Sequence, residues 1–358
     1  MSAIGWCPAE RLGEVQAFIE SHWKRGHVLS RDAELLRWQH PRPDPDELSI
    51  LVADGPGGQL QGILGVIPVP YCTHGKRGEG AWLTTWVVRP EARSGQLGLA
   101  LLRVAMQGPD FVGTLGGNDT TMRLLRALRF DTRATVPRWV RGGSPEALRA
   151  LLDAAGVTPV PAALAASPAG DAPVGITVEP WSHEAAVAWD RTWHERIAGR
   201  IAGTWRDSAY LDWRYVGHPR FDYELRLARA LDGDALGLLV YRRQRVQGRE
   251  EEVVRVLELL GEPQGASALA VHLARDTVGE RTAFLDFYCT SPPFAAALTG
   301  AGGFVAEAAL SVSLPALFQP LDARRTALTA ALWTPTEGGF GGDDVYFTRA
   351  DCDQDRPN

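Results

Sequence analysis

The sequence predicts an α+β protein of two domains, each a mostly antiparallel mixed sheet flanked by helices. The chain has 358 residues, enough for two domains of about 150 residues each. The segment 142–175 is rich in Ala, Pro and Gly and contains no aromatic residue, which is typical of an interdomain linker. The expected order of elements before this linker recurs loosely after it. We therefore expect domains at 1–141 and 176–358.

Hydrophobic periodicity and turn residues predict the elements of the first domain. Apolar residues at helical spacing indicate helices over Ala9–Trp23 and Ser30–His40. The turn DGPGG then separates two arms of a hairpin, Ser49–Ala53 and Gln61–Tyr71. After the turn-rich stretch His74–Gly80, the remaining elements are a strand at Ala81–Val88, a helix at Gln96–Gln107, a strand at Phe111–Leu115, a helix at Asp119–Leu128 and a strand at Asp131–Arg141.

The second domain repeats this order without obvious sequence identity. A short helix around Glu146–Ala155 is expected inside the linker. The elements expected after the linker are helices at Ser182–Arg196 and Ser208–Tyr215, strands at Tyr223–Ala230, Ala235–Arg245 and Glu252–Leu260, a helix at Gly265–Thr277, a strand at Ala283–Tyr288, a helix at Pro293–Thr299 and a strand at Phe304–Leu314.

Composition and charge exclude several classes of protein. With 45% hydrophobic residues the chain can bury real cores, which excludes a disordered protein. Lys and Arg total 37 against 43 Asp and Glu, which argues against a nucleic-acid partner because such binding relies on clustered basic residues. No apolar run approaches the roughly 18–20 residues that span a bilayer, and the N-terminus does not resemble a signal peptide. We expect a soluble, cytoplasmic protein that binds no membrane.

Cysteine and histidine spacing predicts neither disulfides nor a metal site. The four cysteines lie far apart, and the histidines show no metal-ligand spacing. Asp351, Asp353 and Asp355 alternate as in a calcium loop, but Arg356 stands where that loop needs glycine. We therefore expect Asp343–Asn358 to be a solvated acidic end. The oligomeric state is left open.

One segment carries a pattern that points to chemistry. Trp82–Leu102, WLTTWVVRPEARSGQLGLALL, predicts a strand, a turn at a proline, a loop with two glycines and a helix. Gly95 and Gly98 allow the backbone to approach a ligand closely, and a helix N-terminus favours an anion. Arg93 adds a positive charge. The segment is either a cradle for pyrophosphate or a purely structural turn.

The same segment resembles a known family. VVRPEARSGQLGLALL is similar to the acyl-CoA-binding motif of the GNAT superfamily of N-acyltransferases, Gln/Arg-x-x-Gly-x-Gly/Ala, with Arg93 first, Gly98 last and Gln96 in place of the usual Gly. Downstream, NDTTMRLLRALRF resembles the family's N-x-x-A-x-x-L-Y-x-K-x-G-F segment, with Asn118 matched and Leu125 in place of Tyr. The resemblance covers residues 50–141 closely and 176–314 only in architecture.

The resemblance implies an acetyl-CoA site in the first domain and an amine as acceptor. It places pantetheine along the strand, pyrophosphate on the loop amides, and a backbone amide of the strand at the oxyanion. The implied cofactor-binding residues are Trp86, Val87, Val88, Arg93, Ser94, Gly95, Gln96, Leu97, Gly98, Leu99 and Asn118. Asn118 is alternatively only a helix N-cap. In the second domain the corresponding loop, GEPQGA, lacks an arginine, so we expect no second acyl-CoA there.

The acid–base residues are less determined. Leu125 cannot donate a proton as the family's Tyr does. Glu79 and His74, just before the strand, are candidates for the general base or are merely solvated loop residues. Thr84 and Thr85 point to alternate strand faces, so one of them should face the acceptor.

Acceptor-binding candidates lie in the second domain. In YLDWRYVGHPRFDY, Arg214 and His218 (with Asp212) would bind the acceptor, or the segment is an aromatic helix end that packs on the sheet. Asp286 and Tyr288 share one face of a strand, and Asp286 is unusual in an apolar run, which makes it a candidate for binding or deprotonating an amine.

The resulting hypothesis is a tandem GNAT-like N-acetyltransferase that moves an acetyl group from acetyl-CoA to a primary amine of a small molecule. The first candidate acceptor is a nucleotide-linked amino sugar. The alternatives are another small amine, a protein amine, or a non-catalytic acyl-CoA-binding regulatory protein, which Leu125 and Gln96 would fit.

Overall fold

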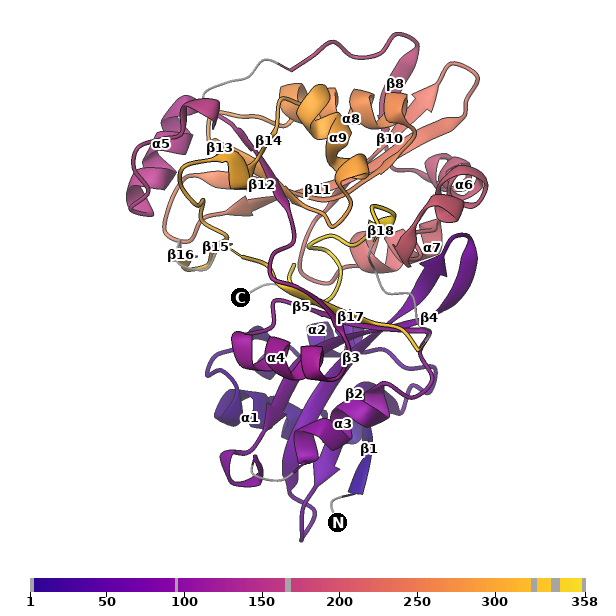
Figure 1. Ribbon diagram of the computed structural model, residues 1–358, viewed down its shortest axis with the longest axis vertical. Helices are drawn as coiled ribbons and strands as arrows, with labels where there is room; N and C mark the ends of the chain where they lie inside the picture. The colour runs from indigo at the N-terminus through magenta and orange to yellow at the C-terminus, as the bar shows by residue number, and fades with distance from the viewer. Residues whose placement is uncertain (1–2, 94–95, 165–168, 323–326, 336–341, 356–358) are drawn as a thin grey trace.

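Two mixed sheets, each flanked by helices, form the two lobes of the molecule (Figure 1). The structure is a computed structural model that describes residues 3–93, 96–164, 169–322, 327–335 and 342–355. The helices are α1 Leu12–His22, α2 Ala33–Gln39, α3 Leu97–Ala105, α4 Asp119–Ala127, α5 Pro145–Ala154, α6 His183–Thr192, α7 Ser208–Leu211, α8 Pro263–Asp276 and α9 Pro292–Gly300. The predicted two-domain α+β fold is confirmed.

The first sheet has the strand order β1-β2-β3-β4-β5-β17-β6, with β9 pairing β3 and β18 pairing β9. Its strands are β1 Ala3–Pro8, β2 Glu47–Asp54, β3 Leu60–Thr73, β4 Lys76–Val88, β5 Phe111–Leu115, β6 Asp131–Arg133, β9 Ala202–Thr204, β17 Ala330–Trp333 and β18 Val345–Tyr346. Alternate residues of β2 face opposite layers: Ile50 joins the core under α1 and α2, and Leu51 the core under α3 and α4.

The second sheet has the order β14-β7-β13-β12-β11-β10-β8. Its strands are β7 Arg138–Gly142, β8 Ile176–Pro180, β10 Glu224–Ala230, β11 Ala235–Arg245, β12 Glu252–Gly261, β13 Thr282–Tyr288 and β14 Val305–Ala306. As in the first sheet, the two strands that flank a loop and helix are parallel: β4 pairs with β5, and β12 with β13. This repeated unit is the architectural repeat that the sequence indicated.

The two domains exchange strands. The C-terminal strand β17 lies between β5 and β6 of the first sheet, where Figure 1 shows it in yellow among the indigo and purple strands. Conversely, β7 pairs with β13 of the second sheet. The single strand expected at Asp131–Arg141 is therefore two strands, β6 and β7, in different sheets. The sequence-based boundary at residue 141 falls inside β7, after the chain has already crossed.

Two further segments differ from expectation. The expected linker helix exists as α5, but Leu148, Leu151 and Leu152 are buried against the second sheet, so this part of the linker belongs to a core. The strand expected at Phe304–Leu314 is only β14, followed by the 3-10 turn Glu307–Ala309, because Glu307 turns inward to an ion pair with Arg138.

A single hydrophobic core joins the domains. It includes Trp82 and Phe111 of the first sheet, Trp189 of α6, and Phe347 after β18. The Phe347 ring stacks on Phe111 at 5.2 Å and meets Trp82 edge-on at 5.0 Å. The domains therefore share buried surface instead of being tethered side by side. Within the described ranges, none of the helices combines the length and apolar character needed to cross a membrane.

Candidate functional site

The strands β4 and β5 separate part-way along their length and leave a cavity between them. Their parallel pairing ends at Trp82 and Gly113, and Thr114 Oγ1 donates a last hydrogen bond to Leu83 O at 3.0 Å. Beyond this point a cavity of about 280 Å³ opens between the two strands. We name it the strand cavity. It is lined by Trp23, Leu83, Thr84, Thr85, Trp86, Thr114, Leu115, Gly116, Gly117, Asn118, Thr121, Leu125, Asp353 and Gln354.

A bulge in β4 brings both of its threonines to the strand cavity. In the register with β3, Gly65 faces Thr84 and Ile63 faces Val87, so Thr85 and Trp86 together oppose one residue. Thr85 has a φ of 32°, which breaks the alternation of strand faces. Both threonines therefore line the cavity, whereas strict alternation of strand faces would place only one of them there. Both side chains are buried, and within the described residues neither hydroxyl has a hydrogen-bond partner.

Helix α4 closes the far wall of the strand cavity. Asn118 is its N-cap, because its Oδ1 accepts from the Thr121 amide at 2.9 Å, and the same residue lines the cavity. Leu125 is completely buried and lines the cavity from the next turns of the helix. An aliphatic side chain thus occupies the position at which the family pattern has a tyrosine.

The loop after β4 leads into the N-terminus of α3. Gln96 is the N-cap residue of α3 and Gly98 lies in its first turn, next to the Trp86 ring. The Arg93 side chain is exposed, and its Nε donates to Val88 O at 3.1 Å, at the end of β4. Of the other predicted cofactor residues, Val87 and Val88 end β4, and Leu97 and Leu99 lie in α3. Ser94 and Gly95 lie outside the described residues.

The segment 348–355, which we name the tail segment, reaches the strand cavity from the second domain. Its Gln354 Nε2 donates to Leu115 O at 3.0 Å, and Cys352 Sγ lies 3.5 Å from Leu83 O. These contacts bring Asp353 to the cavity wall. The expected solvated acidic end is therefore wrong: Asp351, Asp353 and Asp355 are all at least nine-tenths buried.

Buried arginines explain how two aspartates of the tail segment, Asp351 and Asp355, can be buried. Arg206 Nη2 lies 2.6 Å from Asp351, and Arg242 Nη2 lies 2.6 Å from Asp355. Arg242 holds the pKa of Asp355 well below its usual range, against the opposing effect of burial. The partners in these two ion pairs are 145 and 113 residues apart in sequence, so no local sequence pattern predicts them.

A second, smaller cavity lies between the domains and shares Asp353 with the lining of the strand cavity. We name it the interdomain cavity. It is lined by Leu35, Trp38, Gln39 and Ile67 of the first domain, by Trp213, Arg214 and His218 of the second, and by Cys352, Asp353 and Asp355. Trp38 and Trp213 stack with ring centroids 5.4 Å apart. Arg214 and His218 were predicted to bind the acceptor. They line the interdomain cavity together with Asp353, and Asp353 also lines the strand cavity.

The other acid–base and acceptor candidates lie elsewhere. His74 and Glu79 are exposed at the opposite end of β4, where His74 Nε2 lies 2.6 Å from Asp344 Oδ2. Asp286 is 1% exposed and lies 3.5 Å from Arg255 and 2.7 Å from Arg138, and these two cations offset burial and keep the pKa of Asp286 below the usual range. Tyr288 is buried over the Arg138 guanidinium. None of these four residues lines the strand cavity or the interdomain cavity.

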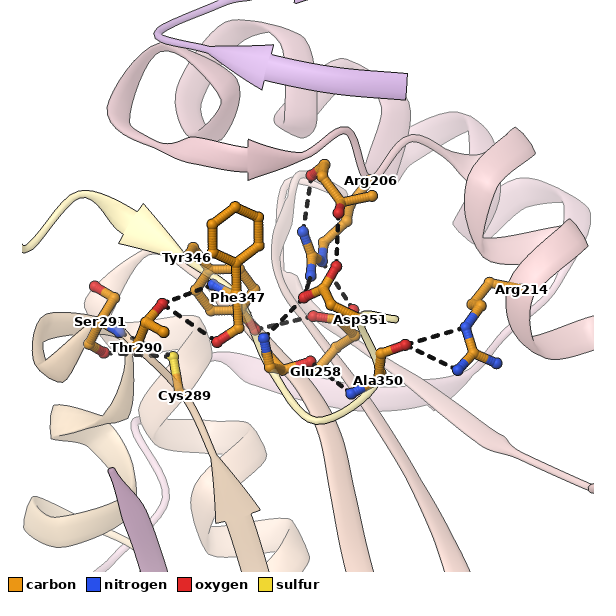
Figure 2. A network of polar contacts seen from close by, with 12 residues as sticks. Arg206, Arg214, Glu258, Cys289, Thr290, Ser291, Tyr346, Phe347, Ala350 and Asp351 are labelled. Atoms are coloured by element: carbon orange, nitrogen blue, oxygen red, sulfur yellow. Dashed lines mark hydrogen bonds and ion pairs between the residues drawn. The ribbon is translucent and has the colours of Figure 1, made fainter. Parts of the chain in front are cut away.

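The equivalent gap in the second sheet is filled by the chain itself (Figure 2). Pairing of β12 with β13 ends at Val256 and Phe287. Beyond it, Tyr346 Oη accepts from the Leu259 amide at 3.1 Å and donates to Glu258 Oε2 at 3.0 Å. Thr290 completes the closure, since its amide donates to Phe347 O at 2.9 Å. The space that would accept a ligand in the first sheet therefore holds Tyr346 and Phe347 in the second.

Sequence reasoning missed Asp353, Gln354, Trp38 and Trp213. The signal that could have found Asp353 was its place a few residues after the apolar run Val345–Phe347, which a buried strand would bring into the protein. Trp38 and Trp213 come from different domains, so no local pattern unites them.

No protein-family model and no curated protein matches this chain. Solved structures do resemble it. A probable N-acyltransferase from Enterococcus faecalis has a TM-score of 0.52 at 13% identity, over 80% of this chain and 65% of its own length. A GCN5-related N-acetyltransferase from Anabaena variabilis has a TM-score of 0.55 at 11% identity, over 92% of this chain and 72% of that one. Saccharomyces cerevisiae N-myristoyltransferase with bound myristoyl-CoA has a TM-score of 0.53 at 13% identity, over 93% and 83%.

These likenesses concern the fold. The chain spans just under two thirds of the Enterococcus protein's length, and the identities are all below 15%. They agree with the architecture described above, in which a strand–loop–helix unit beside diverging parallel strands is present in each sheet.

Proposed function

We propose that this chain, which has the GCN5-related N-acetyltransferase fold, is an acyl-CoA-dependent N-acyltransferase. The observation that carries the proposal is the strand cavity, a polar opening between diverging strands with the buried Thr84 and Thr85 hydroxyls unpaired in the described structure. Buried hydroxyls without partners cost free energy unless a ligand or water satisfies them. The cavity also lies beside the strand that leads to the N-terminus of α3, where an anion is favoured.

The acyl donor would lie along β4 and across the start of α3. Backbone groups of Trp86–Val88, on the edge of β4 that β5 has left, would pair with the pantetheine amides as an added strand does. Amides from Gln96 to Leu99 and the charge of Arg93 would hold the pyrophosphate. We take acetyl-CoA as the donor, as the resemblance implies, and a primary amine of a small molecule as the acceptor. The nucleotide-linked amino sugar remains a prediction.

The residues around the cavity suggest how each would act. Backbone amides at the Thr85–Trp86 bulge would stabilise the negative charge that develops on the thioester oxygen. Asp353 would take the proton that the amine loses on attack, since it is the carboxylate on the wall that both cavities share. Leu125 offers no proton to the leaving thiolate, which would depart without help from that position.

The test compares Asp353 with the carboxylate first expected to act. Thiol release from acetyl-CoA is measured with a mixture of primary amines. We expect Asp353→Asn to lower kcat by about 10²-fold or more, the usual contribution of a general base, with CoA affinity retained. Glu79→Gln is the matched control, because Glu79 is exposed at the far end of β4, and it should stay close to the unaltered protein. Equal activity of both variants would remove Asp353 from the mechanism.

A regulatory acyl-CoA-binding protein is the second candidate, and Leu125 is the observation that favours it. Tight CoA binding measured by calorimetry, together with no thiol release for any amine offered, would favour this role over catalysis.

A further inference from the structure

Arg214 is a buried cation that forms no ion pair with any residue that the structure describes. Its side chain is 5% exposed, and its Nε and Nη2 both donate to the Ala350 carbonyl, at 3.2 and 2.8 Å. No carboxylate among the described residues lies within ion-pair distance of it, and its Nη1 makes no hydrogen bond there, but Asp355 is near enough to help raise the pKa of Arg214 against the effect of burial. By contrast, the buried Arg206 and Arg242 each have a carboxylate partner. A buried charge without a partner is costly unless a ligand neutralises it.

His218 adds a second unpaired donor to the same cavity. Its Nδ1 accepts from the backbone amides of Arg220 and Phe221, at 3.1 and 3.0 Å. A ring nitrogen that accepts cannot carry the proton, so the neutral ring holds it on Nε2. Burial and the neighbouring arginines lower the pKa of His218 to about 3, which keeps the ring neutral at pH 7. Nε2 is buried and, within the described residues, unpaired.

Both donors line the interdomain cavity, whose free volume is about 10 Å³. That is room for roughly one water-sized oxygen. Two donors, one of them a guanidinium without a carboxylate at ion-pair distance, favour an anionic oxygen over a neutral one, against the charges of Asp353 and Asp355 in the same lining. The rest of a ligand would lie beyond Asp353, in the strand cavity of about 280 Å³.

We infer that Arg214 and His218 form a carboxylate subsite for the acyl acceptor, so that the acceptor is an amine that also carries a carboxylate. The inference rests on the proposed function and specifies its substrate class. One carboxylate oxygen would enter the interdomain cavity, and the amino group would point past Asp353 toward Thr84 and Thr85. An amino acid zwitterion complements both charges, with its carboxylate at Arg214 and its ammonium group at Asp353. Asp355 also lines this cavity, and its ion pair with Arg242 at 2.6 Å reduces its repulsion of a bound carboxylate.

The test uses triplets of acceptors that differ at one group: a free amino acid, its primary amide and the corresponding decarboxylated amine. Phenylalanine, phenylalaninamide and phenethylamine form one triplet, and a nucleotide-linked amino sugar is added as a separate arm. Thiol release from acetyl-CoA gives kcat/KM for each. We expect the acid to exceed its amide by about 10- to 100-fold, as for a hydrogen-bonded charged pair. Arg214→Gln should remove this preference, and His218→Phe should reduce it.

A binding experiment separates this inference from the proposed function. The same acids and amides are added to the CoA-loaded protein, and thermal unfolding is followed. Acids that raise Tm in the unaltered protein but not in Arg214→Gln support the subsite even if no amine is acetylated, in which case the proposed function fails alone. Equal effects of acid and amide on both rate and Tm would overturn the subsite and leave only a water in the cavity. If Arg214→Gln does not fold, the acid-to-amide comparison on the unaltered protein decides.

Discussion

Removing the charge of Arg206 should destabilise the protein strongly, and Arg206→Met is the change that tests this. Arg206 is completely buried, with Nε 2.8 Å from Glu258 and Nη2 2.6 Å from Asp351 (Figure 2). Met has a similar length and no charge. The substitution therefore leaves two carboxylates facing each other in the core without a cation.

The structure sets the size of the expected loss. Removing one partner of a buried ion pair costs about 3–5 kcal/mol. Two features limit the loss to about the lower end of that range. The hydroxyls of Tyr215 and Tyr346 donate to Glu258 at 2.7 and 3.0 Å and remain in the variant. Burial also raises the pKa of Glu258, so this carboxyl can take a proton once Arg206 is gone. We expect a loss of about 3 kcal/mol in the free energy of unfolding.

Urea unfolding at pH 7, followed by the fluorescence of the 12 tryptophans, measures this loss. Arg200→Met is the matched control, because Arg200 and Glu262 form a half-exposed pair at 3.2 Å. Such surface pairs contribute at most about 1 kcal/mol. Adding Glu258→Gln to Arg206→Met should recover part of the loss. If Arg206→Met costs no more than Arg200→Met, the network does not stabilise the fold as argued.

Three further expectations follow from the site. Gly98→Glu should weaken CoA binding in calorimetry by about tenfold or more at low salt, since it puts a negative charge in the first turn of α3, while Gly98→Gln should change it only a few-fold; equal losses would mean that size, not charge, matters. CoA titration should give one site per chain, because Tyr346 and Phe347 fill the second gap; two sites would contradict this. In the folded protein the pKa of His218 is about 3, below the unfolded value of about 6.5. The free energy of unfolding should therefore fall as the pH drops from 6.5 towards 3, because the unfolded chain binds the proton more readily. His218→Gln should flatten this pH dependence when unfolding in urea is measured across that range.

The sequence predicts well those elements whose buried face can be identified from the spacing of apolar residues within the element itself. The face of α1 formed by Leu12, Val15, Phe18 and Ile19 is buried as its spacing predicts, and α3 begins within a residue of its expected position. In both segments the spacing of the apolar residues predicts which face of the helix packs against the neighbouring sheet.

What could not be predicted depends on partners distant in sequence. Nothing local distinguishes β17, AALW, as a strand inserted between β5 and β6. Likewise, the local sequence around Asp351 and Asp355 is typical of a solvated segment. Their burial depends on ion pairs with Arg206 and Arg242, which are distant in sequence. Of the residues that line the two cavities, Thr84, Asn118, Arg214 and His218 were candidates from sequence, whereas Asp353 was not, because its position depends on the second domain.

The strand exchange bears on how such a chain can evolve. A tandem duplication normally yields two modules that can be lost, shuffled or fused separately. Here a gene for the first half would lack β17, an internal strand, and so would leave β6 without its neighbour. A gene for the second half would lack β7, which lies between β13 and β14. Recombination at the middle of the gene would thus damage both sheets at once, so we expect the two domains to be inherited together.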